Sequence, residues 1–258
     1  MNIRIALSLL AAVALHAGAQ EFDKVLLPIA PQRVEGAFGS AWVTELAITN
    51  LSTTPIRVSR LPNCFPICVP DPLPGKATVF VPNLVPASNL IGQLAMVEKG
   101  RLADVAMTLR SRDTSRQSET WGTSIPVVAP NDLFSRTFGL SDIPMETQFR
   151  ATLRIYDVNA ATPPRVRVRY YEVHPLGTAA VADELVAEVE PSFSMPLPGQ
   201  IEAFPASAEI PLWLDQELLK HNRIRIEVEP LDGAQEYWAF VSITHNVTQH
   251  VTLITPQP

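Results

Sequence analysis

The chain of 258 residues carries 20 Lys and Arg and 26 Asp and Glu, which gives a formal net charge of −6. This mildly acidic balance argues against nucleic acid or an anionic membrane surface as a partner. The 24 prolines and 11 glycines are typical of short strands joined by turns, and the length suffices for two cores of ordinary size.

The N-terminal segment, residues 1–19, has the pattern of a cleaved secretory signal peptide. Arg4 is its only charged side chain, a mostly apolar run covers residues 5–15, and residues 17–19 (AGA) match an A-x-A cleavage site. The run is shorter than the roughly 20 apolar residues that span a bilayer, and no later segment is long and apolar enough to do so. We therefore expect a mature chain that is secreted or periplasmic and has no membrane span.

A segment near the start of the mature chain recurs about 100 residues later, a spacing that indicates a duplicated domain rather than a solenoid. WVTELAITN at 42–50 and FRATLRIYD at 149–157 carry an aromatic residue, Leu, Ile and Asn or Asp at matching positions. Similar proline-containing segments precede both copies, which predicts one domain over 22–124 and another over 125–256. Residues 131–147 read as an inserted loop at the domain interface. Without a Gly/Ser linker, the two domains should form a fixed or semi-fixed pair.

Alternation of apolar and polar residues predicts many short strands. The expected strands cover residues 42–48, 56–58, 77–81, 94–98, 104–110, 149–157, 165–170, 185–190, 223–229, 237–244 and 250–254. Only residues 212–221 read as a short helix. Short strands about 8–12 residues apart favour sandwiches over β-α-β units, so the predicted fold is all-β, with two tandem immunoglobulin-like antiparallel β-sandwich domains.

The chain has two cysteines, Cys64 and Cys68, in the first half. In an oxidising compartment we expect a local disulfide between them, which would shape a loop rather than hold the fold together. The C-x-x-x-C spacing between prolines does not match a redox C-x-x-C, and a metal site lacks two further ligands nearby.

Arginines on two predicted strands form a candidate binding surface. The strand over 165–170 places arginines on one face and apolar residues on the other, and we expect the strand over 149–157 to pair with it. An anionic ligand or partner could bind there; the alternative is ordinary cross-strand pairing with acids such as Glu188, Glu190 and Glu227. The candidate residues are Arg150, Arg154, Arg165, Arg167 and Arg169.

Four tryptophans are present, at Trp42, Trp121, Trp213 and Trp238. Trp42 is in phase with the apolar residues of its strand and reads as a core residue. For the other three tryptophans, both an exposed and a packed position are possible from the sequence. An exposed ring would suit stacking against a sugar, whereas large aromatic side chains are more often packed.

No motif in the sequence names a catalytic, cofactor-binding or metal-binding residue. G-x-S-x-G, H-E-x-x-H and a phosphate-binding glycine loop are all absent. His245 and His250 lie an odd number of residues apart, so a continuous strand would place them on opposite faces. We expect no cofactor and favour a protein without enzymatic activity, although absent motifs do not exclude catalysis, because triads assemble from distant positions.

Short patterns in both halves of the chain carry a family resemblance. Those of the first half are Pro28, Gly36-Ala-Phe-Gly39-Ser40, Trp42-x-Thr44-x-Leu46 and Asn50. They resemble uncharacterised secreted bacterial proteins with tandem immunoglobulin-like β-sandwich repeats. The pattern of the second half, Phe149-Arg-x-x-Leu153-x-Ile155-Tyr, resembles the second repeat of that family. The resemblance implies two sandwiches and no established activity.

A looser resemblance, in architecture only, is to periplasmic pilus chaperones. Their subunit-anchoring Arg and Lys pair has no counterpart at matching positions here.

These observations favour a secreted, non-catalytic interaction or structural module, extracellular or periplasmic, whose partner is an unknown protein or glycan. One alternative is a secreted hydrolase or carbohydrate-binding accessory protein, which requires a pocket with two carboxylates or exposed tryptophans. Another is a periplasmic assembly chaperone, which requires an exposed apolar edge strand.

Overall fold

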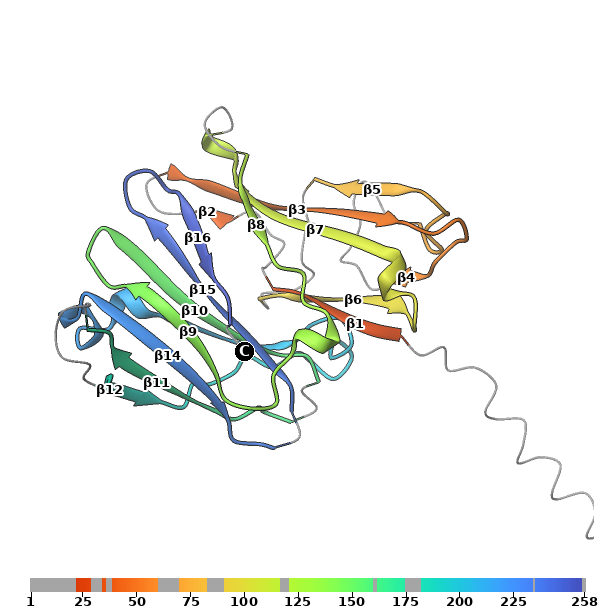
Figure 1. The fold of residues 1–258 in the computed structure, drawn as a ribbon. Coiled ribbons are helices and arrows are strands. Elements are labelled where there is room, and N and C mark those ends of the chain that lie inside the picture. The colour runs from red at the N-terminus through yellow and green to blue at the C-terminus, as the bar shows by residue number, and fades with distance from the viewer. Residues whose placement is uncertain are drawn as a thin grey trace, which may run out of the picture.

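The computed structural model describes residues 22–28, 34–35, 39–59, 70–82, 91–116, 121–159, 162–174, 182–233 and 235–256. Within them the protein is all-β, with four antiparallel sheets and short 3₁₀ turns (Figure 1). None of the helices there is long and apolar enough to cross a membrane. The expected signal peptide, Cys64 and Cys68 lie outside the described residues, so the leader and the disulfide stay predictions.

The first half of the chain, residues 22–125, forms two sheets. One has the strand order β1-β6-β4; the other has β3 at its centre, with β7 and then β8 on one side and β2 and β5 on the other. The strands are β1 (Phe22–Leu27), β2 (Val34–Glu35), β3 (Ala41–Asn50), β4 (Val58–Ser59), β5 (Thr78–Val81), β6 (Gln93–Glu98), β7 (Val105–Asp113) and β8 (Thr123–Ile125).

The second half, residues 138–256, also forms two sheets, with the orders β13-β10-β15-β16 and β12-β11-β14-β9. A connecting segment, residues 126–137, joins the halves. The strands are β9 (Phe138–Pro144), β10 (Phe149–Asp157), β11 (Val166–Glu172), β12 (Glu184–Val189), β13 (Ala206–Pro211), β14 (Arg223–Pro230), β15 (Tyr237–His245) and β16 (Val251–Ile254).

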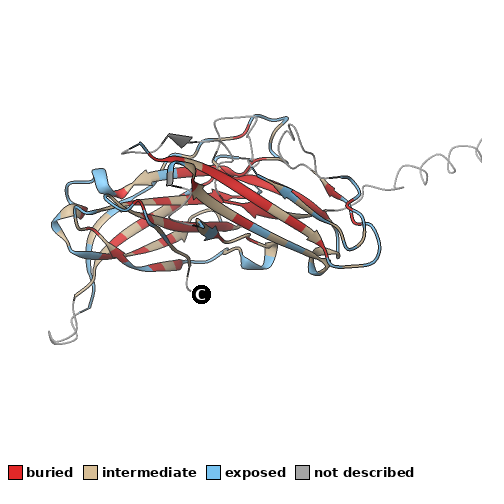
Figure 2. Cartoon of the chain, turned by 90° about the horizontal axis from the view of Figure 1, so that it is seen from above, coloured by how far each residue is buried: buried red, intermediate tan, exposed pale blue. Residues whose placement is uncertain are grey.

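Each half buries its own core between its two sheets. Leu46 of β3 and Leu109 of β7 pack against Val97 of β6 in the first core. Leu153 of β10 and Val168 of β11 occupy the second core, and both are fully buried. Figure 2 shows the buried residues concentrated along the central strands of both halves. Two cores follow because every sheet has at least one apolar face that must be covered.

A third cluster of buried residues joins the two halves. Leu26 and Leu94, on β1 and β6, point away from the first core and pack with Tyr156, Trp238 and Phe240 of β10 and β15. The sheet of β1 and β6 is therefore buried on both faces. Two long-range backbone hydrogen bonds support this junction, from the Leu94 N–H to the Ala203 carbonyl and from the Leu26 N–H to the Val128 carbonyl, each 2.9 Å.

The recurring segments take matching places as β3 and β10. Each is an inner strand that is paired antiparallel on both sides. Each ends in the same local turn, because the Asn50 side-chain oxygen accepts the Ser52 N–H at 2.9 Å and Asp157 accepts the Asn159 N–H at 2.8 Å. Side chains of this type cap such turns through their own backbone.

Two local predictions are wrong. Residues 131–147 are not a loop, because they contain β9, which pairs with β14 and buries Phe138 and Leu140. Residues 212–221 do not form one helix but two 3₁₀ turns, η5 (Leu212–Leu214) and η6 (Leu218–Lys220). Asp215 separates them, and its carboxylate accepts the backbone N–H groups of Glu217 and Leu218.

Candidate functional site

The five predicted arginines do not share one surface. β10, with Arg150 and Arg154, pairs with β13 and β15. β11, with Arg167 and Arg169 and with Arg165 immediately before it, pairs with β12 and β14 in a different sheet. The expected pairing of the two arginine strands is wrong. The candidate surface therefore divides into an ion-paired row on β11 and two separate arginines on β10.

The row on β11 lies against acidic side chains of the neighbouring strands. Arg167 contacts Glu188 at 3.2 Å and Glu229 at 3.4 Å, and Arg169 contacts the same two carboxylates at 2.9 and 2.8 Å. Arg165 pairs with Glu190 at 3.1 Å. These are the cross-strand ion pairs that the alternative interpretation predicted. The three arginines therefore already have carboxylate partners within the protein.

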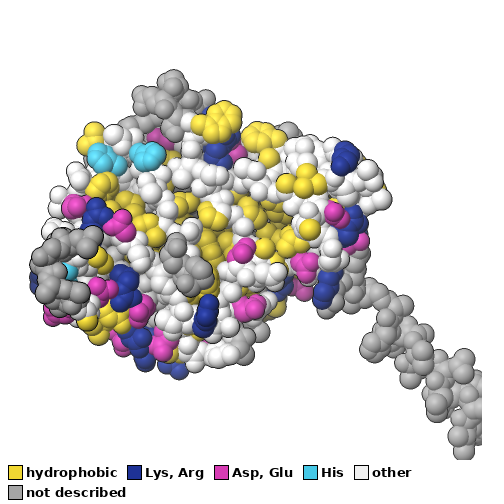
Figure 3. Space-filling view, in the orientation of Figure 1, with side chains coloured by type: hydrophobic (Ala, Val, Ile, Leu, Met, Phe, Trp, Pro, Cys, Tyr) yellow, Lys and Arg dark blue, Asp and Glu magenta, His cyan; other side chains and the backbone are white. Residues whose placement is uncertain are grey.

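Arg154 lies on the β10 face that is turned toward the first half. Its Nε contacts Glu209 at 2.8 Å, and its Nη1 donates to the Ser242 hydroxyl at 2.7 Å. Together with Trp42 and Leu253 it lines a cleft of about 190 Å³ between the sheets of the two halves. Hydrophobic side chains gather between the halves in Figure 3. The cleft is narrow, and its arginine is already engaged.

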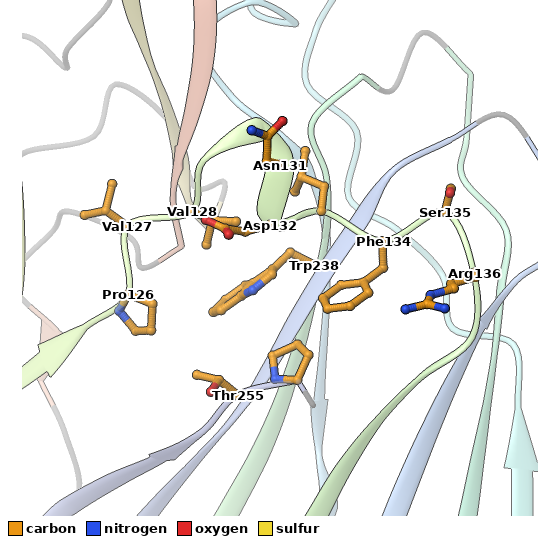
Figure 4. Close-up of a pocket in the computed structure, with 12 residues that line it drawn as sticks. Pro126, Val127, Val128, Asn131, Asp132, Phe134, Ser135, Arg136, Trp238 and Thr255 are labelled. Atoms are coloured by element: carbon orange, nitrogen blue, oxygen red, sulfur yellow. The ribbon is translucent and has the colours of Figure 1, made fainter. Parts of the chain in front are cut away.

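A larger hollow of about 530 Å³, which we name the junction groove, lies where the connecting segment passes the end of β16. Pro126, Phe134, Arg136, Trp238 and Pro256 are among the residues that line it. Figure 4 shows the side chains of Pro126, Phe134, Arg136 and Trp238 arranged around it. Its volume falls within the range of small-molecule sites, which are largely apolar with a few placed polar groups.

The connecting segment is fixed in place by backbone hydrogen bonds at both ends. Val128 pairs with Leu26 of β1, and Phe134 pairs with Tyr237 of β15 through two 2.8 Å hydrogen bonds. Between these anchors, the Asp132 carboxylate accepts the backbone N–H of Ala129 at 3.1 Å. The groove is therefore built on a segment that both halves hold.

Arg136 is the positively charged group of the groove, and it is open to a ligand. Its side chain is exposed and makes no hydrogen bond or ion pair with another described residue. Asp132, the carboxylate in the groove, accepts one backbone hydrogen bond through one of its two oxygens. An aromatic and proline-lined hollow with one open guanidinium can bind an apolar group that carries a negative charge.

Sequence reasoning missed this groove, although one signal was present in β15. Tyr237, Ala239 and Val241 face the second core, while Trp238 and Phe240 alternate with them and are also apolar. A strand that is apolar on both faces indicates a second packing surface.

The tryptophans divide between the two interpretations. Trp238 is buried in the third cluster, and Trp42 is half-buried, with its indole N–H donating to the Ser40 hydroxyl at 3.1 Å. Trp213 is 39% exposed and Trp121 is 80% exposed. Trp42 thus borders the cleft rather than filling the core, and Trp121 stands out as an exposed ring.

Two buried polar residues of β10 lie beside the junction. Burial raises the pKa of Asp157 to about 6, and burial also raises the pKa of the Tyr156 phenol above its ordinary range. The Tyr156 hydroxyl has no hydrogen-bond partner among the described residues. Neither side chain lines the junction groove, so we assign both to the stability of the fold rather than to the site.

Within the described ranges, no group of three or more His, Cys, Asp or Glu side chains is arranged to hold a metal ion. No protein family, curated protein or solved structure that we compared matches the chain.

Proposed function

We propose that the protein is a secreted, non-catalytic binding module of two tandem immunoglobulin-like β-sandwich domains, with its ligand site in the junction groove. The observation that carries this proposal is the open Arg136 beside an aromatic hollow, in a protein whose β11 arginines are all ion-paired. The N-terminal leader pattern supports secretion, and the duplicated strand pattern supports the tandem sandwiches.

The junction supports binding without catalysis. The third cluster holds the two halves together, so the groove exists before a ligand arrives. A preformed site loses little conformational entropy on binding. The ligand chemistry that fits is an apolar side chain next to a carboxylate, as at the C-terminus of a partner protein.

An assembly chaperone is less well supported. Strand β12 lies at a sheet edge and exposes Leu185 and Val189, as strand addition requires. However, Glu184, Glu188 and the adjacent Glu190 place acidic groups along the same edge. Charged residues at an edge disfavour the addition of another strand.

The test uses a short peptide that ends in phenylalanine, prepared as the free acid and as its amide. Binding is followed through the indole N–H resonance of Trp238 in the full mature chain. The acid should shift this resonance and bind at least about tenfold more tightly than the amide, because a charge-assisted hydrogen bond contributes roughly 1.5–3 kcal/mol. Arg136→Gln should remove the preference for the acid.

The matched control is Arg165→Gln, which removes an exposed arginine that is paired with Glu190 in another sheet. The control should keep the wild-type preference. If neither peptide shifts Trp238 at millimolar concentration, or if Arg136→Gln keeps the preference, the junction groove is not the proposed site.

A further inference from the structure

A second surface, on the first half and away from the junction groove, is built around Trp121. This ring is 80% exposed, and it precedes β8 on the face of the β3-β7-β8 sheet that is turned away from the first core. The guanidinium of Arg110 lies 4.0 Å from the ring centroid. One face of the indole is therefore supported by the protein, while the residue as a whole remains open to solvent.

Arg110 is itself held by a buried carboxylate. Its Nε donates to Glu45 at 3.0 Å, its Nη2 contacts the same oxygen, and Arg112 contacts the other oxygen of Glu45 at 2.7 Å. The side chain of Glu45 is only 4% exposed. An arginine held through two nitrogens has a fixed plane, so the indole that stacks on it has a fixed orientation.

The backbone next to the ring is equally constrained. Gly122 has φ +98°, and a Cβ at this position would lie 2.6 Å from the Ser111 carbonyl oxygen. Only glycine fits this close approach, which brings the chain back onto β7 and places Trp121 over Arg110. The ring is thus oriented by Arg110, which Glu45 holds in place, and by the close approach of the backbone at Gly122.

Two hydroxyl-bearing residues share this face of the sheet. Ser124 is opposite Arg110 in the β7–β8 pair, and Thr108 is two residues before Arg110 on the same face. Both residues are exposed. The surface therefore combines a flat aromatic face with neutral hydrogen-bonding groups, while Arg110 and Arg112 are engaged by Glu45.

We propose that Trp121 is a stacking platform for a neutral sugar ring of a glycan. A pyranose has an apolar C–H face and an edge of hydroxyl groups, which match the open indole and the neighbouring serine and threonine. Glu45 offsets one of the two guanidinium charges, so the test also includes an acidic polysaccharide, which distinguishes stacking from attraction to positive charge. The site is separate from the junction groove and does not depend on the ligand proposed there.

The test is electrophoresis of the mature protein through native gels that contain a neutral polysaccharide. Polygalacturonate is run as an acidic control. The neutral panel is hydroxyethyl cellulose, mixed-linkage β-glucan, arabinoxylan, galactomannan and dextran. At least one should retard the wild-type protein. Trp121→Ala should weaken the retarding interaction about tenfold or more, a loss that corresponds to about 1.4 kcal/mol.

Two further variants distinguish stacking from a structural role of the ring. Trp121→Leu keeps an apolar cover over Arg110 but removes the flat face, so it should lose retardation while keeping the wild-type unfolding midpoint. Phe80→Ala removes another exposed aromatic side chain, 48% exposed on β5 of the same sheet, and should keep retardation.

The proposal is overturned if no polysaccharide of the panel retards the wild-type protein, or if Trp121→Leu is retarded as strongly as wild type. Retardation only by polygalacturonate, and only at low salt, would also overturn it, because charge rather than stacking would then control binding. None of these results would affect the junction groove, whose test uses Trp238 and a peptide.

Discussion

Replacing Asp157 with Asn should stabilise the protein above about pH 6 and leave its stability nearly unchanged near pH 4. Asp157 is fully buried, and desolvation raises its pKa from an ordinary value of 3.8 to about 6. The folded protein therefore favours the neutral acid. The stability that this proton provides is fully present below pH 3.8 and is lost as the pH rises through 6.

The size of the effect follows from the shift of the pKa. About two pKa units at 1.36 kcal/mol each correspond to about 3 kcal/mol of lost stability once the buried carboxyl is ionised. Asn keeps an oxygen that can accept the Asn159 N–H, and it replaces the second carboxylate oxygen, which has no hydrogen-bond partner among the described residues. The variant thus removes the buried charge and retains the turn.

The assay is urea denaturation of wild type and variant between pH 4 and pH 8. The difference in unfolding free energy should grow from near zero to about 2–3 kcal/mol, and contributions from other groups cancel in that difference. The control, Glu184→Gln, removes an exposed acid of β12 and should give a flat difference. A flat profile for Asp157→Asn, or a loss of stability at pH 8, would refute the argument.

Four other substitutions test packing and charge, each by urea denaturation at neutral pH. Leu46 and Leu153 are fully buried in separate cores, so truncation of either to Ala should lower the unfolding free energy by about 2–5 kcal/mol. A cost below about 1 kcal/mol would show that the site is loosely packed. Arg167→Gln should change stability by less than about 1 kcal/mol, because its ion pairs are partly exposed and Arg169 binds two of the same carboxylates. A larger loss would mean that these ion pairs hold the sheet together. Tyr156→Phe should be neutral or stabilise by up to about 1 kcal/mol. It removes a buried hydroxyl that has no hydrogen-bond partner among the described residues. A clear loss of stability would point to a bound water or another partner for that hydroxyl.

The all-β antiparallel fold could be predicted because many strands bury one face and expose the other. β11 and β14 are examples, with apolar residues in the second core and charged residues on the outer face. β1 was missed because it has no such contrast. Its Val25 and Leu27 face the first core, while Leu26 between them faces the third cluster. A strand buried on both faces reads as a plain apolar run.

β9 was missed for a different reason. Its pairing with β14 shifts register between Ile224 and Ile226, so Phe138 and Leu140 face the core, and so does Ile143 three residues later. Asp142, with φ +64°, lies at this irregularity. A bulge of this kind interrupts the two-residue period on which strand prediction depends.

The arginine surface shows a further limit of sequence patterns. Alternation correctly placed Arg167 and Arg169 on the outer face of β11, with Arg165 immediately before the strand, but it does not reveal which strands pair. The chain crosses from one sheet to the other between β10 and β11, so Arg154 lies in the cleft instead. The junction groove and the Trp121 platform likewise depend on contacts between distant segments, which local patterns do not contain.

The sheet of β1 and β6 has a consequence for the order in which the protein can fold. Its outward side chains, Leu26 and Leu94, belong to the part of the chain that is made first, whereas Trp238 and Phe240, which cover them, lie close to the other end. Until β15 is synthesised, a folded first half would present an apolar strip to its surroundings. Such transiently exposed surface promotes aggregation, so a fragment that ends near residue 125 should self-associate even when its own core has formed.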